Sequence, residues 1–251
     1  MHPILLKLGP LTLYSWGAMV TLGFLAGILC VLWLAKREGL ARDNILDLAF
    51  FVLLGSIIGA RLFYVIQFWR DFQDNLWRIF AVQEGGLVFY GGFLGAIAVI
   101  AAYVYLKKLD LWKLLDVIAP GVALGYAIGR IGCFLNGCCY GIPTQLPWGI
   151  TFPPGSLANY EFGARPLHPT QLYASIAGLL IFAILMLIRR YKKFDGFIAL
   201  LGIILYSSYR FAIEFIRINP TYFRHLTGAQ IIAAGLFIIA LLILLYRARK
   251  S

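Results

Sequence analysis

Long apolar runs, separated by short stretches that carry most of the charges, dominate this sequence and restrict the folds open to it. Each of seven runs is long enough to cross the roughly 30 Å hydrocarbon core of a bilayer as a helix. These runs cover residues 14–35, 45–68, 87–106, 114–135, 171–188, 196–216 and 230–246. Hydrophobic residues make up 61% of the chain and charged residues 13%, a balance that excludes a water-soluble core. We therefore expect an all-α, polytopic membrane protein with seven transmembrane helices.

The charged connections predict the orientation of these helices. Lysines and arginines gather in alternate connections, and such loops stay on the cytoplasmic side of a membrane. The clusters lie at 36–42, 107–113, 189–193 and 247–250. This pattern predicts an outward N-terminus and a cytoplasmic C-terminus, in agreement with an odd number of spans. The longest connection, 136–170, then lies outside and is expected to form a small extracytoplasmic cap on a single integral membrane domain of residues 1–251.

The net charge of +11 has a membrane explanation as well. In a soluble protein such a charge would indicate a nucleic-acid partner. Here the cationic residues flank apolar spans, where they orient helices and contact anionic lipids. We therefore expect membrane lipids, and no nucleic acid, among the partners.

Glycines recur at small-xxx-small spacing in four of the expected helices and predict close helix packing. The pairs are Gly23 with Gly27, Gly55 with Gly59, Gly91 with Gly95, and Gly125 with Gly129. The segment "EGGLVFYGG", residues 84–92, differs because two Gly-Gly pairs bracket a short apolar stretch at a membrane boundary. A broken helix start that lines a wet cavity and simple packing are both open for this segment.

Few ionisable residues fall inside the spans, where an uncompensated arginine or glutamate costs at least ~3 kcal/mol. Arg61, Arg130 and Arg210 all lie in the outer halves of their helices. Arg210, Glu214 and Arg217 are spaced i, i+4, i+7 and should share one helix face. One interpretation is that Glu214 simply pairs with an arginine and makes its burial tolerable. The other is that Arg130 and Arg210 clamp a phosphate, that of a phospholipid headgroup, because a guanidinium fork suits phosphate oxygens.

The block "GRIGCFLNGCCYG" carries Cys133, Cys138 and Cys139. Together with His168 these residues could form a Cys₃His zinc site, but the block lacks the C-x₂-C pair that zinc motifs favour. We therefore expect no metal site. A Cys133–Cys138 disulfide, small buried thiols and a reactive thiol all remain open.

Seven motifs in this order extend over nearly the whole chain: "LGPLTLYSWGAMVTLGF", "GARLFYV", "EGGLVFYGGFLGA", "GRIGCFLNGCCYG", "LHPTQLYAS", "YRFAIEFIR" and "TGAQIIA". In sequence, order and spacing they resemble the prolipoprotein diacylglyceryl transferase family. The block around Arg130 is the most specific of them. Cys133 and Cys138 stand where well-known members carry an asparagine and a glutamate.

The resemblance implies transfer of the diacylglyceryl group from phosphatidylglycerol to the lipobox cysteine thiol of a prolipoprotein signal peptide. This reaction is the first step of bacterial lipoprotein maturation. It releases glycerol phosphate at the outer leaflet of the inner membrane and requires no cofactor. Arg130 and Arg210 are implied as essential residues that bind the headgroup, and Glu214 and Gly141 match positions tied to activity.

The expected catalytic residues are Arg130, Arg210, Glu214 and Tyr90. Tyr90 stands where some family members carry a histidine, and its unperturbed pKa near 10 makes it a poor general base. It can still hydrogen-bond a phosphate or orient the thiol. The expected substrate-binding residues are Arg61, Tyr64, Asn136, Gly141, His168, Gln171 and Tyr206. We expect the lipid to enter a cavity from the side. The side chains expected to line this cavity are those of Arg61, Tyr64, Tyr90, Arg130, Asn136, Tyr206, Arg210 and Glu214.

Two other functions are compatible with the sequence. A paralogue of the same fold could use a different lipid donor or thiol acceptor, because the block departs from the family pattern at Cys133 and Cys138. A lipid-binding or transport protein would also place charges inside the membrane. The sequence disfavours transport, because it has no apparent inverted repeat and gathers its charges in one leaflet.

Overall fold

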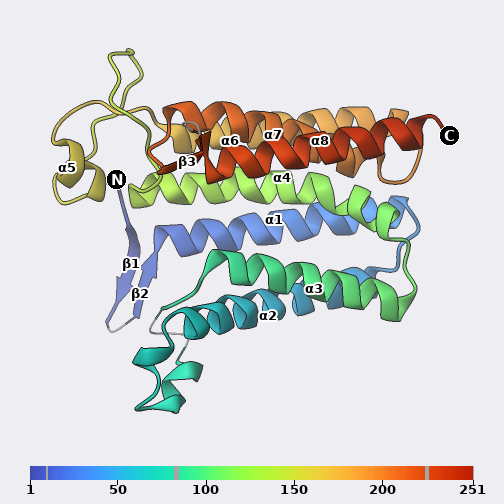
Figure 1. Cartoon of the computed structure of the whole chain (residues 1–251), viewed down its shortest axis with the longest axis horizontal. Coiled ribbons are helices and arrows are strands. Elements are labelled where there is room, and N and C mark those ends of the chain that lie inside the picture. The colour runs from blue at the N-terminus through green and yellow to red at the C-terminus, as the bar shows by residue number, and fades with distance from the viewer. Residues whose placement is uncertain (10, 82–84, 224–225, 251) are drawn as a thin grey trace. The chain divides into compact units, whose positions relative to one another are not determined.

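The computed structural model describes residues 1–9, 11–81, 85–223 and 226–250. Within these residues seven helices are long and apolar enough to cross a membrane. They are α1 (Ser15–Arg37), α2 (Arg42–Gln67), α3 (Phe89–Lys107), α4 (Leu111–Asn136), α6 (Thr170–Ile188), α7 (Phe197–Ile213) and α8 (Gly228–Ala248) (Figure 1). Helices account for 72% of the residues, so the expected all-α class with seven spans is confirmed. This is a multi-pass membrane protein.

Short elements at the helix ends complete the described part of the chain. Strands β1 (Ile4–Leu8) and β2 (Leu11–Tyr14) form an antiparallel hairpin before α1, and β3 (Thr221–Phe223) pairs with β4 (Leu226–Thr227) before α8. The helical turns are η1 (Trp69–Asp71), η2 (Leu76–Phe80), α5 (Leu157–Phe162), η4 (Arg189–Tyr191) and η5 (Glu214–Ile216). The apolar runs did not predict these pieces because each is too short to show a periodic pattern.

The chain divides into two compact units. The first comprises Met1–Leu34 and Leu115–Ser251, and the second comprises Ala35–Leu114. The expectation that residues 1–251 form a single domain remains a prediction.

Glycines bring helix backbones together in the first unit. A Cβ on Gly23 would lie 2.7 Å from the carbonyl oxygen of Gly125, and one on Gly27 would lie 2.9 Å from that of Gly121. Helices α1 and α4 therefore approach backbone to backbone, as small residues allow. On α4 the contacting pair is Gly121 and Gly125, one turn before the predicted pair Gly125 and Gly129. A Cβ on Gly129 would meet no atom within 4 Å.

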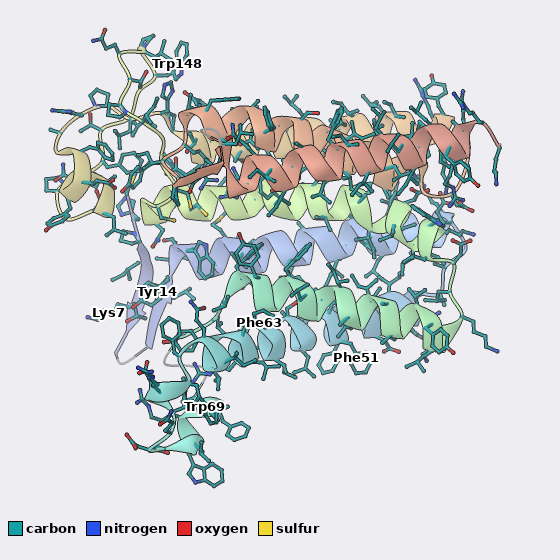
Figure 2. The ribbon with its side chains drawn as sticks, viewed as in Figure 1. Lys7, Tyr14, Phe51, Phe63, Trp69 and Trp148 are labelled. Atoms are coloured by element: carbon teal, nitrogen blue, oxygen red, sulfur yellow. The ribbon has the colours of Figure 1, made fainter. Side chains whose placement is uncertain are left out.

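The second unit uses the same device between α2 and α3. Gly59 faces Gly91 and Gly55 faces Gly95, and a Cβ on Gly59 would lie 3.1 Å from the Cα of Gly95. Close packing is therefore confirmed for the predicted pair Gly55 and Gly59 on α2 and for the predicted pair Gly91 and Gly95 on α3. Figure 2 shows Phe51 and Phe63 on α2, where both side chains are exposed. Large apolar side chains on the outside of a helix suit contact with lipid tails.

The N-terminus of α7 is fixed by a carboxylate from α4. Asp116 Oδ2 accepts a hydrogen bond from Gly196 N at 2.8 Å, and its Oδ1 accepts one from Ala199 N at 2.9 Å. Lys192 Nζ lies 3.2 Å from the same carboxylate. The first N–H groups of a helix lack partners within the helix. Asp116 therefore caps α7, the helix that carries Arg210, and fixes the position of its N-terminus.

The cap predicted for residues 136–170 corresponds to a structured segment, residues 137–169, between α4 and α6. Its extracytoplasmic position remains a prediction. Its small core consists of buried Phe152, Ala158 and Leu167, and the backbone of Leu167 pairs with Ile150 through two hydrogen bonds of 3.0 Å. Trp148 projects from one loop of the cap (Figure 2). Tyr140 packs on the core and donates a hydrogen bond to Glu161 at 2.7 Å. Burial, together with this bond, raises the pKa of Tyr140 to about 12.

Candidate active site

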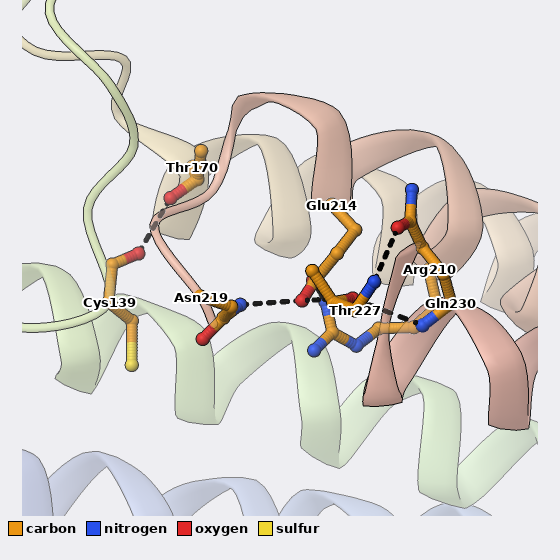
Figure 3. Close-up of polar contacts among 7 residues, drawn as sticks. All are labelled: Cys139, Thr170, Arg210, Glu214, Asn219, Thr227 and Gln230. Atoms are coloured by element: carbon orange, nitrogen blue, oxygen red, sulfur yellow. Dashed lines mark hydrogen bonds and ion pairs between the residues drawn. The ribbon is translucent and has the colours of Figure 1, made fainter. Parts of the chain in front are cut away.

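The predicted pair of Arg210 and Glu214 lies at the end of α7, with Arg210 in its last turn and Glu214 as the first residue of η5. Arg210 Nη1 forms an ion pair with Glu214 Oε2 (Figure 3). The Glu214 side chain is fully buried and that of Arg210 is 19% exposed. A charge pair this deep is maintained only when its remaining polar atoms are also satisfied.

The second oxygen of Glu214 meets that requirement. Glu214 Oε1 accepts hydrogen bonds from Asn219 Nδ2 at 2.6 Å and from Thr227 Oγ1 at 2.9 Å (Figure 3). Thr227 also begins α8 with a capping box, in which Gln230 N donates to Thr227 Oγ1 and Thr227 N donates to Gln230 Oε1. Glu214 therefore joins the end of α7 to the start of α8. The motif "TGAQ" is a recognisable cap, but nothing in the sequence links it to Glu214.

The prediction that Arg217 shares a helix face with Arg210 and Glu214 was wrong. Helix α7 ends at Ile213, the 3₁₀ turn η5 follows, and Arg217 has an extended backbone. Arg217 instead forms an isolated β-bridge with Gly141. The helical spacing rule fails because the α-helix does not continue to this residue.

Arg130 lies on α4 with its guanidinium over the ring of Tyr126, 4.8 Å from the ring centroid. The Tyr126 ring makes an edge contact with Tyr206 of α7, at a centroid distance of 5.4 Å. In the described part of the chain, no ion pair joins Arg130 to a carboxylate. Tyr126 was missed by the sequence analysis, although it precedes Arg130 by one helical turn, a spacing at which side chains meet.

Arginines converge on Tyr206. Arg130, Arg210 and Arg217 each act electrostatically on its hydroxyl group, and Arg130 and Arg217 act on that of Tyr209 as well. Glu214 neutralises one of these three cations. The region therefore carries an excess of positive charge next to hydroxyl groups, a combination that suits a phosphate ligand.

The "GCCYG" turn is bonded to the start of α6. Thr170 Oγ1 donates to Cys139 O, and Gln171 Nε2 donates to Cys138 O, each at 2.6 Å. Gly141 N donates to His168 O at 3.0 Å. The structure thus brings together three predicted substrate-binding residues, Gly141, His168 and Gln171. Gln171 Oε1 is buried and has no hydrogen-bond partner within the described residues.

His168 faces Tyr173. Its Nδ1 lies 3.3 Å from Tyr173 Oη, which also accepts a hydrogen bond from Trp148 Nε1 at 2.7 Å. Asn136, the last residue of α4, is exposed. Both residues therefore lie where α4 and α6 meet the cap.

Gly141 lies at a close approach of backbones. A Cβ there would overlap Ile216 O and would lie 2.8 Å from Thr170 Cγ2 and 2.9 Å from His168 Cβ. We predict that Gly141→Ala lowers the free energy of unfolding by about 1–3 kcal/mol, as overpacking does. Gly235→Ala on α8 is the matched control, because its Cβ would meet no atom within 4 Å. Thermal unfolding in one detergent compares the two variants, and equal unfolding temperatures would contradict the prediction.

The three cysteines of the block form one cluster. The Sγ atoms of Cys133, Cys138 and Cys139 all lie within 4.8 Å of one another, and all are free thiols. Hydrogen bonds from the Cys133 and Cys138 thiols lower the pKa of the Cys139 thiol, and the nearby charges of Arg217 and Arg130 lower it further. Of the alternatives left open above, the disulfide is not formed in this structure.

The second unit holds Arg61, Tyr64 and Tyr90. The Arg61 guanidinium is buried and donates to the carbonyl oxygens of Ile79 at 2.8 Å, Gly85 at 2.7 Å and Gly86 at 3.2 Å, and to that of Arg78. The Tyr64 ring lies 5.6 Å from its Cζ. A cavity of about 80 Å³ adjoins Arg61, Tyr64 and Gly86. Arg61 therefore holds together the segment that leads into α3.

Tyr90 lies in the first turn of α3, is 65% exposed and makes an edge contact with Phe89. Residues 82–84, the start of the segment 84–92, lie outside the described residues. Gly85 and Gly86 have positive φ angles of 86° and 72°, and the chain becomes helical only at Phe89. Helix α3 therefore begins after the first Gly-Gly pair, and a wet cavity lined by this segment remains a prediction. The cavity predicted to join Arg61, Tyr64 and Tyr90 with the other site residues remains a prediction.

A multi-pass membrane protein in which a half-buried arginine pairs with a fully buried glutamate is the class that this fold and site define. The chain matches the family model described as prolipoprotein diacylglyceryl transferase over residues 3–246. It is 39% identical over 239 residues to the phosphatidylglycerol–prolipoprotein diacylglyceryl transferase of Finegoldia magna, with 94% of this chain and 91% of the relative covered. Its identity to the protein of that name from Clostridium tetani is 38%, with 88% of this chain and 87% of the relative covered. Its identity to that from Geobacter sulfurreducens is 36%, with 99% of this chain and 96% of the relative covered. The chain belongs to the prolipoprotein diacylglyceryl transferase family, as its motifs suggested.

Proposed function

We propose that this chain transfers the diacylglyceryl group of phosphatidylglycerol to the lipobox cysteine thiol of prolipoproteins, the first step of bacterial lipoprotein maturation. Family membership over nearly the whole chain and the names of the relatives support this proposal. The observation in the structure that carries it is that three arginines act electrostatically on Tyr206, and within the described residues one of the three pairs with a carboxylate. Such a site attracts the phosphate of an anionic lipid headgroup.

The chemistry assigns distinct roles to these residues. The thiol sulfur attacks a glycerol carbon of the lipid, a C–S bond forms, and the C–O bond to the phosphate breaks. The thiol proton leaves with the glycerol phosphate, whose freed phosphate oxygen accepts it. Negative charge accumulates on the departing glycerol phosphate, and Arg130 and Arg210 stabilise it there. Glu214 holds Arg210 in place, and Tyr206 donates a hydrogen bond to the phosphate. Tyr90 orients the thiol.

The remaining predicted residues bind or position the substrates. Gln171 Oε1 is a buried acceptor without a partner in the described residues, and it accepts a hydrogen bond from the bound substrate. Gly141 and His168 keep the "GCCYG" turn against α6, and Asn136 faces the headgroup from the end of α4. Arg61 and Tyr64 bind the lipid in the second unit.

The protein acts in the bacterial inner membrane. The cationic connections place the N-terminus outside and the C-terminus in the cytoplasm. The cap then lies on the outer face, where the signal peptide of an exported prolipoprotein arrives, and the site opens toward the outer leaflet. Phosphatidylglycerol and the prolipoprotein signal peptide are its partners.

Transfer by the purified chain tests this function. Phosphatidylglycerol that carries a label in the diacylglyceryl group is mixed with a peptide that contains a lipobox. We expect a thioether-linked lipopeptide by mass spectrometry and an equal amount of released glycerol phosphate. A peptide with serine in place of the lipobox cysteine is the control and should stay unmodified.

Two results would contradict the proposal. If well-folded protein forms no lipopeptide, the chain is not this transferase. If phosphatidylethanolamine replaces phosphatidylglycerol as the better donor, the chain is the paralogue with a different lipid that the substitutions at Cys133 and Cys138 left open.

A further inference from the structure

Three cysteines within seven residues of the sequence meet at the end of α4. Cys133 lies in the last turn of the helix, and Cys138 follows the helix end, where its N–H donates to the carbonyl oxygen of Cys133 at 3.1 Å. Gly137 and Cys139 both have left-handed backbone angles, with φ of 74° and 63°. This reversal of the chain returns the later two thiols to the first, so that all three Sγ atoms lie within 4.8 Å of one another.

Two buried side chains hold the reversal in place. Thr170 and Gln171 are 2% and 1% exposed, and they bond the carbonyl oxygens of Cys139 and Cys138 (Figure 3 shows the bond from Thr170). A non-glycine residue in the left-handed region is strained and persists only where its surroundings determine it. The cluster is therefore a built feature of the fold and not an accident of three flexible side chains.

We propose that Cys133, Cys138 and Cys139 form a three-thiolate site for a thiophilic metal ion such as Zn²⁺ or Cu⁺. Zinc–sulfur bonds of about 2.3 Å require Sγ atoms about 3.8–4.0 Å apart, so each thiol has to move by less than about 1 Å. Soft thiolate ligands select ions of this class. Sequence spacing alone disfavoured a metal here, because the zinc pattern assumes a C-x₂-C turn that this chain replaces with a helix end and two left-handed residues.

The charges around the cluster fit such an ion. Binding converts three thiols and one Zn²⁺ into a Zn(SR)₃ group of charge −1 and three released protons. Arg217 acts electrostatically on Cys139, and its positive charge offsets that of the complex. His168 does not supply a fourth ligand, because its ring faces Tyr173. Among the described residues no fourth His, Cys, Asp or Glu joins the cluster, so an added ligand or water would complete the coordination.

Metal binding by the full-length, reduced and metal-free protein in detergent tests the site. Co²⁺ serves as a spectroscopic probe for Zn²⁺, since a thiolate–cobalt charge-transfer band reports sulfur ligands. Separate titrations with Zn²⁺ and Cu⁺ against a competing chelator distinguish the two ions. We expect one ion per chain. Serine at Cys133, Cys138 or Cys139 should weaken binding by on the order of a hundredfold or more, because even changes behind the ligands cost 10–100-fold.

Cys30 provides the matched control, because this free thiol on α1 lies outside the cluster. Cys30→Ser should bind as the wild type does. The proposal is overturned if the wild type binds no ion, or if binding survives serine at all three clustered positions. It is also overturned if Cys30→Ser loses the ion.

A second measurement needs no variant and so does not depend on the folding of mutants. Wild-type protein is alkylated with and without Zn²⁺, and the modified cysteines are identified by peptide mass spectrometry. We expect Zn²⁺ to slow the modification of the clustered thiols at least tenfold and to leave Cys30 unchanged. Equal rates at the cluster would count against the site. Neither readout involves lipid transfer, so the result is independent of the proposed function.

Discussion

Replacement of Glu214 by alanine is expected to lower the free energy of unfolding by about 3–5 kcal/mol, the cost of removing one partner from a buried ion pair. The carboxylate is fully buried, and its loss leaves the Arg210 cation without its partner. Asn219 and Thr227 lose their acceptor at the same time. Denaturant or thermal unfolding in a fixed detergent measures the effect.

Asp195→Ala is the matched control for this change. Asp195 also pairs with a cation, Lys192, at 2.7 Å, but its side chain is 42% exposed. An exposed pair contributes only about 0–1 kcal/mol, so this variant should unfold close to the wild type. If Glu214→Ala also stayed within about 1 kcal/mol of the wild type, Glu214 would not be the junction between α7 and α8.

Glu214→Gln separates the two roles of the carboxylate. The amide oxygen can still accept from Asn219 and Thr227, so much of the junction is retained. The charge that holds Arg210 is lost. We therefore expect this variant to fold better than Glu214→Ala and still to transfer diacylglyceryl groups slowly. Wild-type activity in Glu214→Gln would show that Arg210 needs no carboxylate to keep its position.

The sequence predicted those features that depend on local spacing and on hydrophobicity. Long apolar runs located all seven spans, and the i, i+4 spacing identified the pair of Arg210 and Glu214. The same rule placed Arg217 wrongly, because it assumes helical backbone and cannot detect that the chain becomes extended at Arg217, after the 3₁₀ turn that holds Glu214. Spacing rules therefore hold only within an element whose end is known.

Contacts between distant segments were beyond the sequence. Thr227 reaches Glu214 from 13 residues away, and Gln171 reaches the backbone of Cys138 from 33 residues away. Both hydrogen bonds depend on how the end of one helix packs against the next element, and no single sequence motif predicts that packing. The cysteine cluster is a related case, because two left-handed residues create a proximity that the linear pattern argued against.

Replacement of Arg130 by alanine is expected to reduce kcat/KM for lipid transfer by about 10²–10³, the range found when one donor to a developing negative charge is removed. Its guanidinium lies over Tyr126 and, among the described residues, forms no ion pair with a carboxylate. The free charge is therefore available to the phosphate. Initial rates at varied phosphatidylglycerol measure the effect.

The Arg130 variants also separate charge from shape. Arg130→Lys keeps the positive charge but loses the planar fork that grips two phosphate oxygens, so it should recover only part of the lost rate. Arg165→Ala, at an exposed arginine of the cap, controls for the loss of one cation from the protein. Full activity in Arg130→Ala would remove Arg130 from the proposed phosphate site.

Effects on stability and on activity should be coupled at Arg210 and should separate at Arg130. Arg210 is bound to a buried carboxylate that also joins two helices, so changes around it should alter folding and activity together. Arg130 contacts an aromatic ring and carries no such structural pair, so Arg130→Ala should unfold close to the wild type while it loses transfer. If the proposed phosphate site is right, binding needs both kinds of cation. Arg210 fixes the geometry of the site, and Arg130 supplies charge that no carboxylate of the described residues pairs with.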